Sequence, residues 1–116
     1  MAYRFVILQH RLPTEDHWDV MLETDSGLTT WSIPPQNSSG QSFVCSALPL
    51  PMHRKEYLNY EGTITGCRGV VTRVDSGTYE QISSETFMLY GTNFIGKLTL
   101  EKGMMTFDID NTPQHQ

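Results

Sequence analysis

The sequence predicts a mainly β fold: a small closed or nearly closed antiparallel β-barrel of about eight strands with one short helix. Charged residues make up only 18% of the 116 residues, and Thr, Val, Ile and aromatic residues recur in short segments. Gly, Pro and Asp-Ser-Gly turn signals separate these segments. A closed barrel is favoured because closure leaves no exposed edge strands. We expect a single domain over residues 3–110 and a disordered tail over residues 111–116.

The first two strands are predicted to form a hairpin. Tyr3 to His10 contains the apolar run Phe5 to Leu8, which is typical of a strand buried on both faces. The turn signal Leu12-Pro13-Thr14 follows, and a second strand is expected over residues 17–23.

The middle of the chain is predicted to contain two further strands and the helix. Leu28 to Ile33 alternates polar and apolar residues, and Ser42 to Leu48 could form a fourth strand. We expect Pro49-Leu50-Pro51 to break any β-ladder, because proline lacks a backbone N–H. Met52 to Leu58 is the one segment that favours a helical turn.

The last part of the chain is predicted to be a meander of strands joined by tight turns. Asp75-Ser76-Gly77 is typical of a hairpin turn, and Gly96 suggests a bulge or a tight barrel corner. The predicted strands are Arg68 to Val74, Thr78 to Ile82, Thr86 to Tyr90, Phe94 to Leu100 and Met104 to Ile109.

Two histidines and an aspartate form a candidate metal site. Strand alternation places His17, Asp19, Met21 and Glu23 on one face, and the hairpin would bring His10 close to His17 and Asp19. Imidazole and carboxylate ligands without thiolate suit Mn, Zn or Fe(II) and leave positions open for water and substrate. The alternative is that both histidines are ordinary surface or hydrogen-bonded residues.

A second candidate group surrounds His53. A protonated imidazole and the guanidinium of Arg54, close to Tyr57, could hold a phosphate through charge-assisted hydrogen bonds. The alternative is an exposed basic end of a helix.

Composition limits the classes of partner. The formal net charge of -5 argues against a protein that coats nucleic acid non-specifically, because such binding depends on neutralising phosphates. Cys45 and Cys67 show no C-x-x-C spacing, which indicates reduced thiols. Since no segment is long enough for a signal peptide or a membrane span, we expect a cytoplasmic protein with no membrane partner.

Six blocks of the chain resemble the 3′-phosphoesterase domain of bacterial DNA ligase D. They occur in one register between about residues 3 and 101, which makes them more specific together than any single motif. The blocks are Tyr3-Arg4-Phe5-Val6-Ile7-Leu8-Gln9-His10, His17-Trp18-Asp19-x-x-Leu22-Glu23, Gly27-Leu28-x-x-Trp31-x-Ile33-Pro34, His53-x-x-x-Tyr57-x-x-Tyr60-Glu61-Gly62, Asp75-x-Gly77-Thr78-Tyr79-Glu80 and Phe94-x-Gly96-Lys97-x-Thr99-Leu100.

The resemblance implies a small barrel with a divalent metal, Mn above others, that trims 3′-phosphate and 3′-ribonucleotide ends during DNA strand-break repair. By position, His10, His17 and Asp19 would be the metal ligands, and His53 would be catalytic through its contact with the phosphate. The residues assigned to substrate or phosphate binding are Arg54, Tyr57 and Glu23. The implied partners are a nucleic-acid 3′ end or another phosphate ester, together with a separate ligase or polymerase.

The chain departs from this family where arginines are expected. Met21 stands two residues after the metal aspartate, and another expected arginine falls near Cys45. Arg11, Arg54 or Arg68 could compensate for them. One alternative is therefore a non-catalytic module that binds phosphate or nucleic-acid ends and keeps the barrel and the metal ligands. Another is a structural domain without metal.

Overall fold

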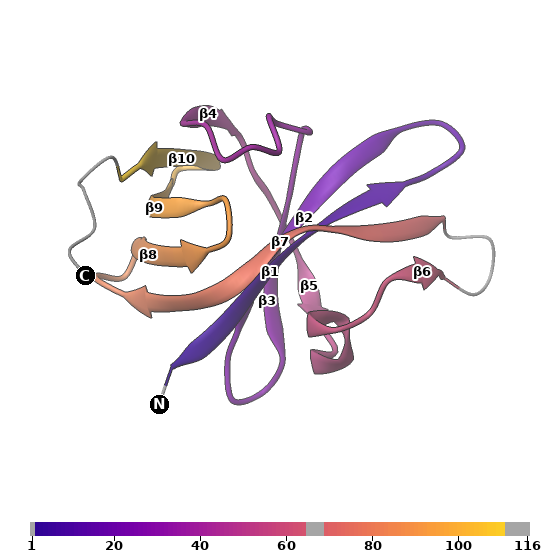
Figure 1. Cartoon of the computed structure of the whole chain (residues 1–116), viewed down its shortest axis with the longest axis horizontal. Coiled ribbons are helices and arrows are strands. Elements are labelled where there is room, and N and C mark those ends of the chain that lie inside the picture. The colour runs from indigo at the N-terminus through magenta and orange to yellow at the C-terminus, as the bar shows by residue number, and fades with distance from the viewer. Residues whose placement is uncertain (1, 65–68, 111–116) are drawn as a thin grey trace.

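A computed structural model describes residues 2–64 and 69–110 of the chain (Figure 1). Cys67, Arg68 and the predicted tail over residues 111–116 lie outside the described residues. The fold is mainly β, as predicted. The elements are β1 (Tyr3–Arg11), β2 (Asp16–Glu23), β3 (Leu28–Ile33), β4 (Phe43–Ser46), β5 (Leu48–His53), the 3-10 turn η1 (Lys55–Leu58), β6 (Gly62–Thr63), β7 (Val70–Gln81), β8 (Thr86–Gly91), β9 (Ile95–Glu101) and β10 (Met104–Ile109).

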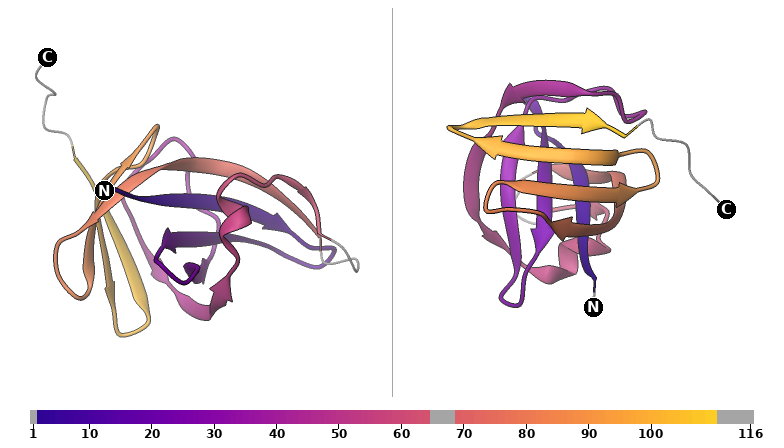
Figure 2. Two further views of the ribbon diagram at one scale, coloured as in Figure 1. Left: turned by 90° about the horizontal axis from the view of Figure 1, so that it is seen from below. Right: turned by 90° about the vertical axis from the view of Figure 1, so that its left-hand side faces the viewer.

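The strands form a nearly closed antiparallel barrel. Nine of them follow the order β4-β10-β9-β8-β7-β1-β2-β3-β5, and β6 pairs with β7 outside this path. The two edge strands, β4 and β5, are separated in the chain only by Ala47, so the chain itself joins the two edges. Figure 2 shows β8, β9 and β10 crossing in front of β1, β2 and β3 at a steep angle, which is the geometry of orthogonal sheet packing. The predicted barrel is confirmed.

Strands β1 and β2 are buried on both faces because each face contacts a separate apolar cluster. The predicted burial of Phe5 to Leu8 is confirmed: each of the four side chains is at most 3% exposed. The inner cluster fills the barrel and includes Phe5, Ile7, Trp18, Val20, Leu22, Phe94 and Phe107. The outer cluster packs under η1 and consists of Val6, Leu8, Met21, Leu28, Leu58 and Val71.

The Asp75-Ser76-Gly77 segment lies inside β7 and does not form the predicted turn. The buried Asp75 carboxylate accepts backbone hydrogen bonds from Thr92, Asn93 and Phe94, at 3.1, 3.0 and 2.7 Å, so the aspartate fixes a neighbouring loop. A Cβ atom at Gly77 would lie 2.1 Å from the carbonyl oxygen of Tyr90, so the glycine permits close strand approach. Asp75 and Gly77 are therefore present for tertiary contacts, although the same residue types are typical of a turn.

The prediction of a helix over Met52 to Leu58 is wrong in its first half. Met52 and His53 end β5, and only Lys55–Leu58 form a 3-10 turn. The prediction that Pro49-Leu50-Pro51 breaks the ladder is also wrong, because β5 is an edge strand that pairs only with β3 along the path, and edge strands accept proline. Within residues 2–64 and 69–110, no helix is long and apolar enough to span a membrane.

Candidate functional site

The β1–β2 hairpin brings the three predicted metal ligands onto one face. In the antiparallel register, His10 lies opposite His17 and Leu8 lies opposite Asp19. The backbone N–H of Leu12 donates to the carbonyl oxygen of Glu15 at 2.8 Å and closes the turn. Because cross-strand neighbours point to the same face, the two imidazoles meet, with ring centroids 4.8 Å apart.

The candidate ligand atoms of His10, His17 and Asp19 all lie within 4.8 Å of one another. Asp19 Oδ1 is 3.1 Å from His17 Nε2, and Asp19 Oδ2 is 3.7 Å from His10 Nδ1. The side chain of Asp19 is 4% exposed, whereas the two imidazoles are 17% and 16% exposed. The group therefore combines one buried carboxylate with two partly exposed imidazoles, and this set of oxygen and nitrogen ligands suits a divalent transition metal.

The Asp19 carboxylate is incompletely satisfied by the protein. Its buried Oδ1 makes no hydrogen bond among the described residues, although His17 Nε2 is near. Burial raises the pKa of Asp19 above its usual range, and His17, His10 and His53 oppose that shift only in part. A buried oxygen without a hydrogen bond beside two imidazoles is the arrangement that a shared cation would satisfy, so the three side chains fit a metal.

Asp19→Asn is expected to stabilise the metal-free fold. Folding raises the pKa of Asp19, so the protonated carboxyl group favours the folded state at acid pH. This contribution to the free energy of unfolding is lost as the pH rises through the folded-state pKa. In EDTA at neutral pH, the variant should therefore unfold with a free energy about 1 kcal/mol higher than the wild type. Urea unfolding between acid and neutral pH should show this difference shrinking toward acid pH. A variant that is less stable than the wild type at neutral pH would contradict the assignment.

A small cavity of about 130 Å³ connects His10 and Asp19 with His53 and Tyr57, whereas His17 borders it from outside its lining. It is lined by Leu8, His10, Asp19, Met21, His53, Tyr57, Ile64 and Val71. His53 ends β5, and Tyr57 lies in η1, with the two ring centroids 5.9 Å apart. His53 Nδ1 is 2.8 Å from the carbonyl oxygen of Pro51, which can only accept, so Nδ1 carries the proton. The Nε2 atom of His53 is then the ring nitrogen left to act in the cavity.

Arg54 and Glu23 do not line this cavity. The Arg54 side chain is 78% exposed, and its Nε lies 3.7 Å from Glu56 Oε1. Glu23 ends β2, where its carboxylate accepts the backbone N–H of Arg4 at 2.8 Å and lies 3.9 Å from Lys55 Nζ. The structure thus brings together five of the seven residues predicted for the site and places Arg54 and Glu23 elsewhere.

The positions where the resemblance leads one to expect arginine do not supply a cation. Met21 is 1% exposed and belongs to the outer apolar cluster beneath the cavity. Cys45 is a free thiol on β4, and β4 pairs with β10 on the other side of the barrel. Arg11 lies at the exposed end of β1, on the opposite strand face from His10. No lysine or arginine among the described residues lines the cavity.

A larger cavity lies at the other end of β1 and has a different character. It measures about 870 Å³ and includes Tyr3, Glu23, Asp25, Tyr79, Glu80 and Tyr90 in its lining. Tyr90 donates a hydrogen bond to Glu80 at 2.8 Å, and Tyr3 donates one to Asp25. Three carboxylates without a cationic residue in the lining disfavour a phosphate, so the smaller cavity is the better candidate.

Comparison with known proteins gives a consistent result. Residues 8–112 match the family described as the DNA Ligase D 3′-phosphoesterase domain. The chain is 34% identical over 79 residues to the multifunctional non-homologous end joining protein LigD of Mycobacterium bovis, and the same values hold for the LigD proteins of two Mycobacterium tuberculosis strains. In each case the alignment covers 66% of this chain and 10% of the relative.

Proposed function

Because the chain belongs to the DNA ligase D 3′-phosphoesterase domain family, we propose that it is a metal-dependent phosphoesterase that trims 3′-phosphate or 3′-ribonucleotide ends of DNA in strand-break repair. The observation that carries this proposal is the meeting of His10, His17 and Asp19, two of which, His10 and Asp19, line a cavity that also contains His53. Geometry and family membership support the same reaction class.

In this proposal, His10, His17 and Asp19 hold a divalent cation, with Mn the first choice and Zn or another transition metal the alternative. Such a cation, when bound, polarises a phosphoryl oxygen and makes a bound water more acidic. The buried Asp19 carboxylate supplies the negative charge, and its hydrogen-bond deficit favours ion binding over an empty state. The imidazoles complete the ligand set and leave positions open for water and the phosphate.

His53 is proposed to act on the phosphate from the opposite side of the cavity. The Pro51 carbonyl oxygen accepts a hydrogen bond from His53 Nδ1, which leaves Nε2 available for the phosphate. When the ring is protonated, Nε2 carries a proton and donates a hydrogen bond to a phosphoryl oxygen. A donor placed where charge develops stabilises the transition state more than the ground state. Tyr57 packs edge-on against His53 and is proposed to hold the ring in position and to line the phosphate site.

Release of inorganic phosphate from a DNA primer that ends in a 3′-phosphate tests this proposal. The protein loaded with Mn should convert the 3′-phosphate to a 3′-hydroxyl, and EDTA should stop the reaction. The same primer with a 5′-phosphate is the control for end selectivity. If the metal is bound and no phosphate is released, the enzymatic proposal is defeated.

A second candidate function is a non-catalytic module that binds phosphate or nucleic-acid ends. The buried Met21 favours it, because this position offers an apolar side chain beneath the cavity where the family is expected to have a guanidinium. Removal of one charge-assisted hydrogen bond to phosphate costs about 1.5–3 kcal/mol. Turnover that disappears in His53→Ala would rule this candidate out.

The proposed reaction also defines the class of partner enzyme. Its product is a 3′-hydroxyl end, which is the group that polymerases extend and ligases join. A separate ligase or polymerase would therefore consume the product.

A further inference from the structure

We propose that the surface formed by Arg4, Tyr60 and Arg73 binds the single-stranded segment that leads to the trimmed 3′ end, with Tyr60 stacking on a base and the two arginines contacting phosphates. We call these three residues the 4/60/73 surface. The inference rests on the proposed function, because it extends the same site from the terminal phosphate to the strand that precedes it. The ligand class is a single nucleic-acid strand, bound with little dependence on sequence.

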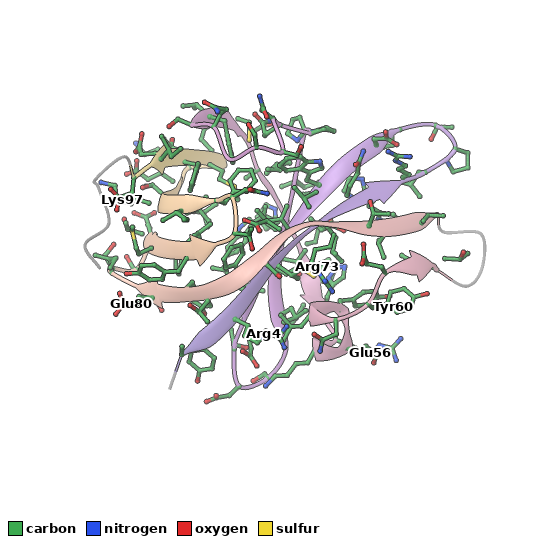
Figure 3. The ribbon with its side chains drawn as sticks, viewed as in Figure 1. Arg4, Glu56, Tyr60, Arg73, Glu80 and Lys97 are labelled. Carbon is green, nitrogen blue, oxygen red and sulfur yellow. The ribbon has the colours of Figure 1, made fainter. Side chains whose placement is uncertain are left out.

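Hydrogen bonds to one short segment bring the three residues together. Arg4 Nη2 donates to Asn59 Oδ1 at 2.9 Å, and the backbone N–H of Arg73 donates to Glu61 Oε2 at 2.7 Å. Tyr60 lies between these two acceptors in the chain. Figure 3 shows Arg4, Arg73 and Tyr60 around η1.

Strand register places both arginines on the face of β1 that carries the metal site. Arg4, Leu8 and His10 alternate onto one face, and Arg73 of β7 pairs directly with Leu8, which lines the small cavity. Arg4 and Leu8 are four residues apart, which corresponds to about 13 Å along a strand. That length accommodates roughly four stacked nucleotides at a rise of ~3.4 Å.

A series of aromatic rings connects this surface to the cavity. The ring centroids of His53 and Tyr57 are 5.9 Å apart, and those of Tyr57 and Tyr60 are 5.8 Å apart. The Tyr60 side chain is 38% exposed, and its hydroxyl donates to the carbonyl oxygen of Thr63, so the ring is both accessible and fixed. Aromatic platforms beside cationic side chains are the common solution for binding single strands.

The cationic residues that the structure describes are distributed unevenly over the barrel. Five cationic residues lie on β1, η1 and β7 or next to them, whereas the other two lie on or next to β9: Arg4, Arg11, Arg54, Lys55 and Arg73 in the first group, and Lys97 and Lys102 in the second. Two carboxylates lie nearby: Glu61 accepts a hydrogen bond from the backbone N–H of Arg73, and Glu56 lies 3.7 Å from Arg54 Nε. Neither forms an ion pair with the Arg73 guanidinium among the described residues.

Fluorescence anisotropy with a labelled single strand of about twelve nucleotides that ends in a 3′-phosphate tests the 4/60/73 surface, with EDTA present to prevent cleavage. Arg73→Glu should weaken binding about tenfold and flatten the dependence of log Kd on log salt by ~0.7 for each phosphate that the variant no longer neutralises. Tyr60→Leu should also weaken binding about tenfold, because the base then has no aromatic ring on which to stack.

Lys97→Glu is the matched control, because it makes the same change of charge at an exposed position beside β8 and β10 (Figure 3). It should bind the strand within about twofold of the wild type, because the distant charge is screened by salt. If Arg73→Glu does not fold, as judged by its unfolding transition, Arg73→Gln replaces it. Wild-type affinity in the Arg73 variant, or an equal loss in Lys97→Glu, would overturn the proposal.

The assay separates this proposal from the proposed function. Strand binding that depends on Arg73 in a protein that releases no phosphate would defeat the enzymatic proposal and support the surface. If the protein releases phosphate but the Arg73 variant binds the strand as tightly as the wild type, the enzymatic proposal is supported and the 4/60/73 surface is overturned.

Discussion

His53→Ala is expected to lower the rate of 3′-phosphate release about 10²- to 10³-fold while leaving the metal content unchanged. The reason is positional: His53 lines the cavity from β5, whereas the candidate metal ligands come from β1 and β2. Its Nε2 is the ring nitrogen left to contact the phosphate, because Nδ1 is bonded to the Pro51 carbonyl oxygen. Single-turnover phosphate release and elemental analysis measure the two quantities separately.

The pattern of losses identifies the role of His53. Loss of a catalytic hydrogen-bond donor should lower kcat more than it changes KM, because the donor acts chiefly in the transition state. Met52→Ala is the control, since Met52 is the exposed neighbour of His53 in β5 and does not line the cavity. An unchanged rate in His53→Ala, or a loss of metal together with the rate, would contradict the assignment.

His17→Ala is expected to have the second large effect, namely loss of the bound ion and with it loss of phosphate release by about 10³-fold or more. His17 Nε2 lies 3.1 Å from Asp19 Oδ1, and its removal leaves one imidazole and one carboxylate for the cation. Electron paramagnetic resonance of added Mn reports free and bound ion directly. The folded state should persist, because the His17 side chain lies near the hairpin end and outside both apolar clusters.

Asp16→Asn provides the matched control for the ligand variant. Asp16 is an exposed carboxylate on the same strand, and alternation points its side chain to the opposite face from His17. This variant should keep both the ion and the activity. If it loses the ion as His17→Ala does, then general surface charge explains metal binding better than the three converging ligands.

The sequence alone was sufficient to predict the arrangement at the hairpin. A tight turn fixes the register of its two strands, so the positions of His10 and His17 on either side of Leu12-Pro13-Thr14 specified that they would lie on one face. The apolar run Phe5 to Leu8 likewise indicated burial on both faces, and the structure confirms it. At the hairpin the two strands are close in the chain, and there the sequence signal and the structure agree.

The remaining features depend on contacts between distant segments. Asp75-Ser76-Gly77 has the composition of a turn, but Asp75 binds three backbone amides some seventeen to nineteen residues away. Glu23 shares a strand face with Asp19, yet four residues of strand separate it from the ligands by about 13 Å. Arg73 was missed because its position beside Leu8 depends on the pairing of β7 with β1, which no local pattern encodes.

Metal removal followed by titration tests the central claim most directly. Protein stripped with EDTA and returned to metal-free buffer should release no phosphate from a 3′-phosphate primer, and activity should return with added Mn and saturate at one ion per chain. The same titration of the His17→Ala variant should restore no phosphate release. Full activity in the stripped protein, or saturation with Mn at one ion per chain without any release of phosphate, would contradict the proposal that these three side chains hold a catalytic cation.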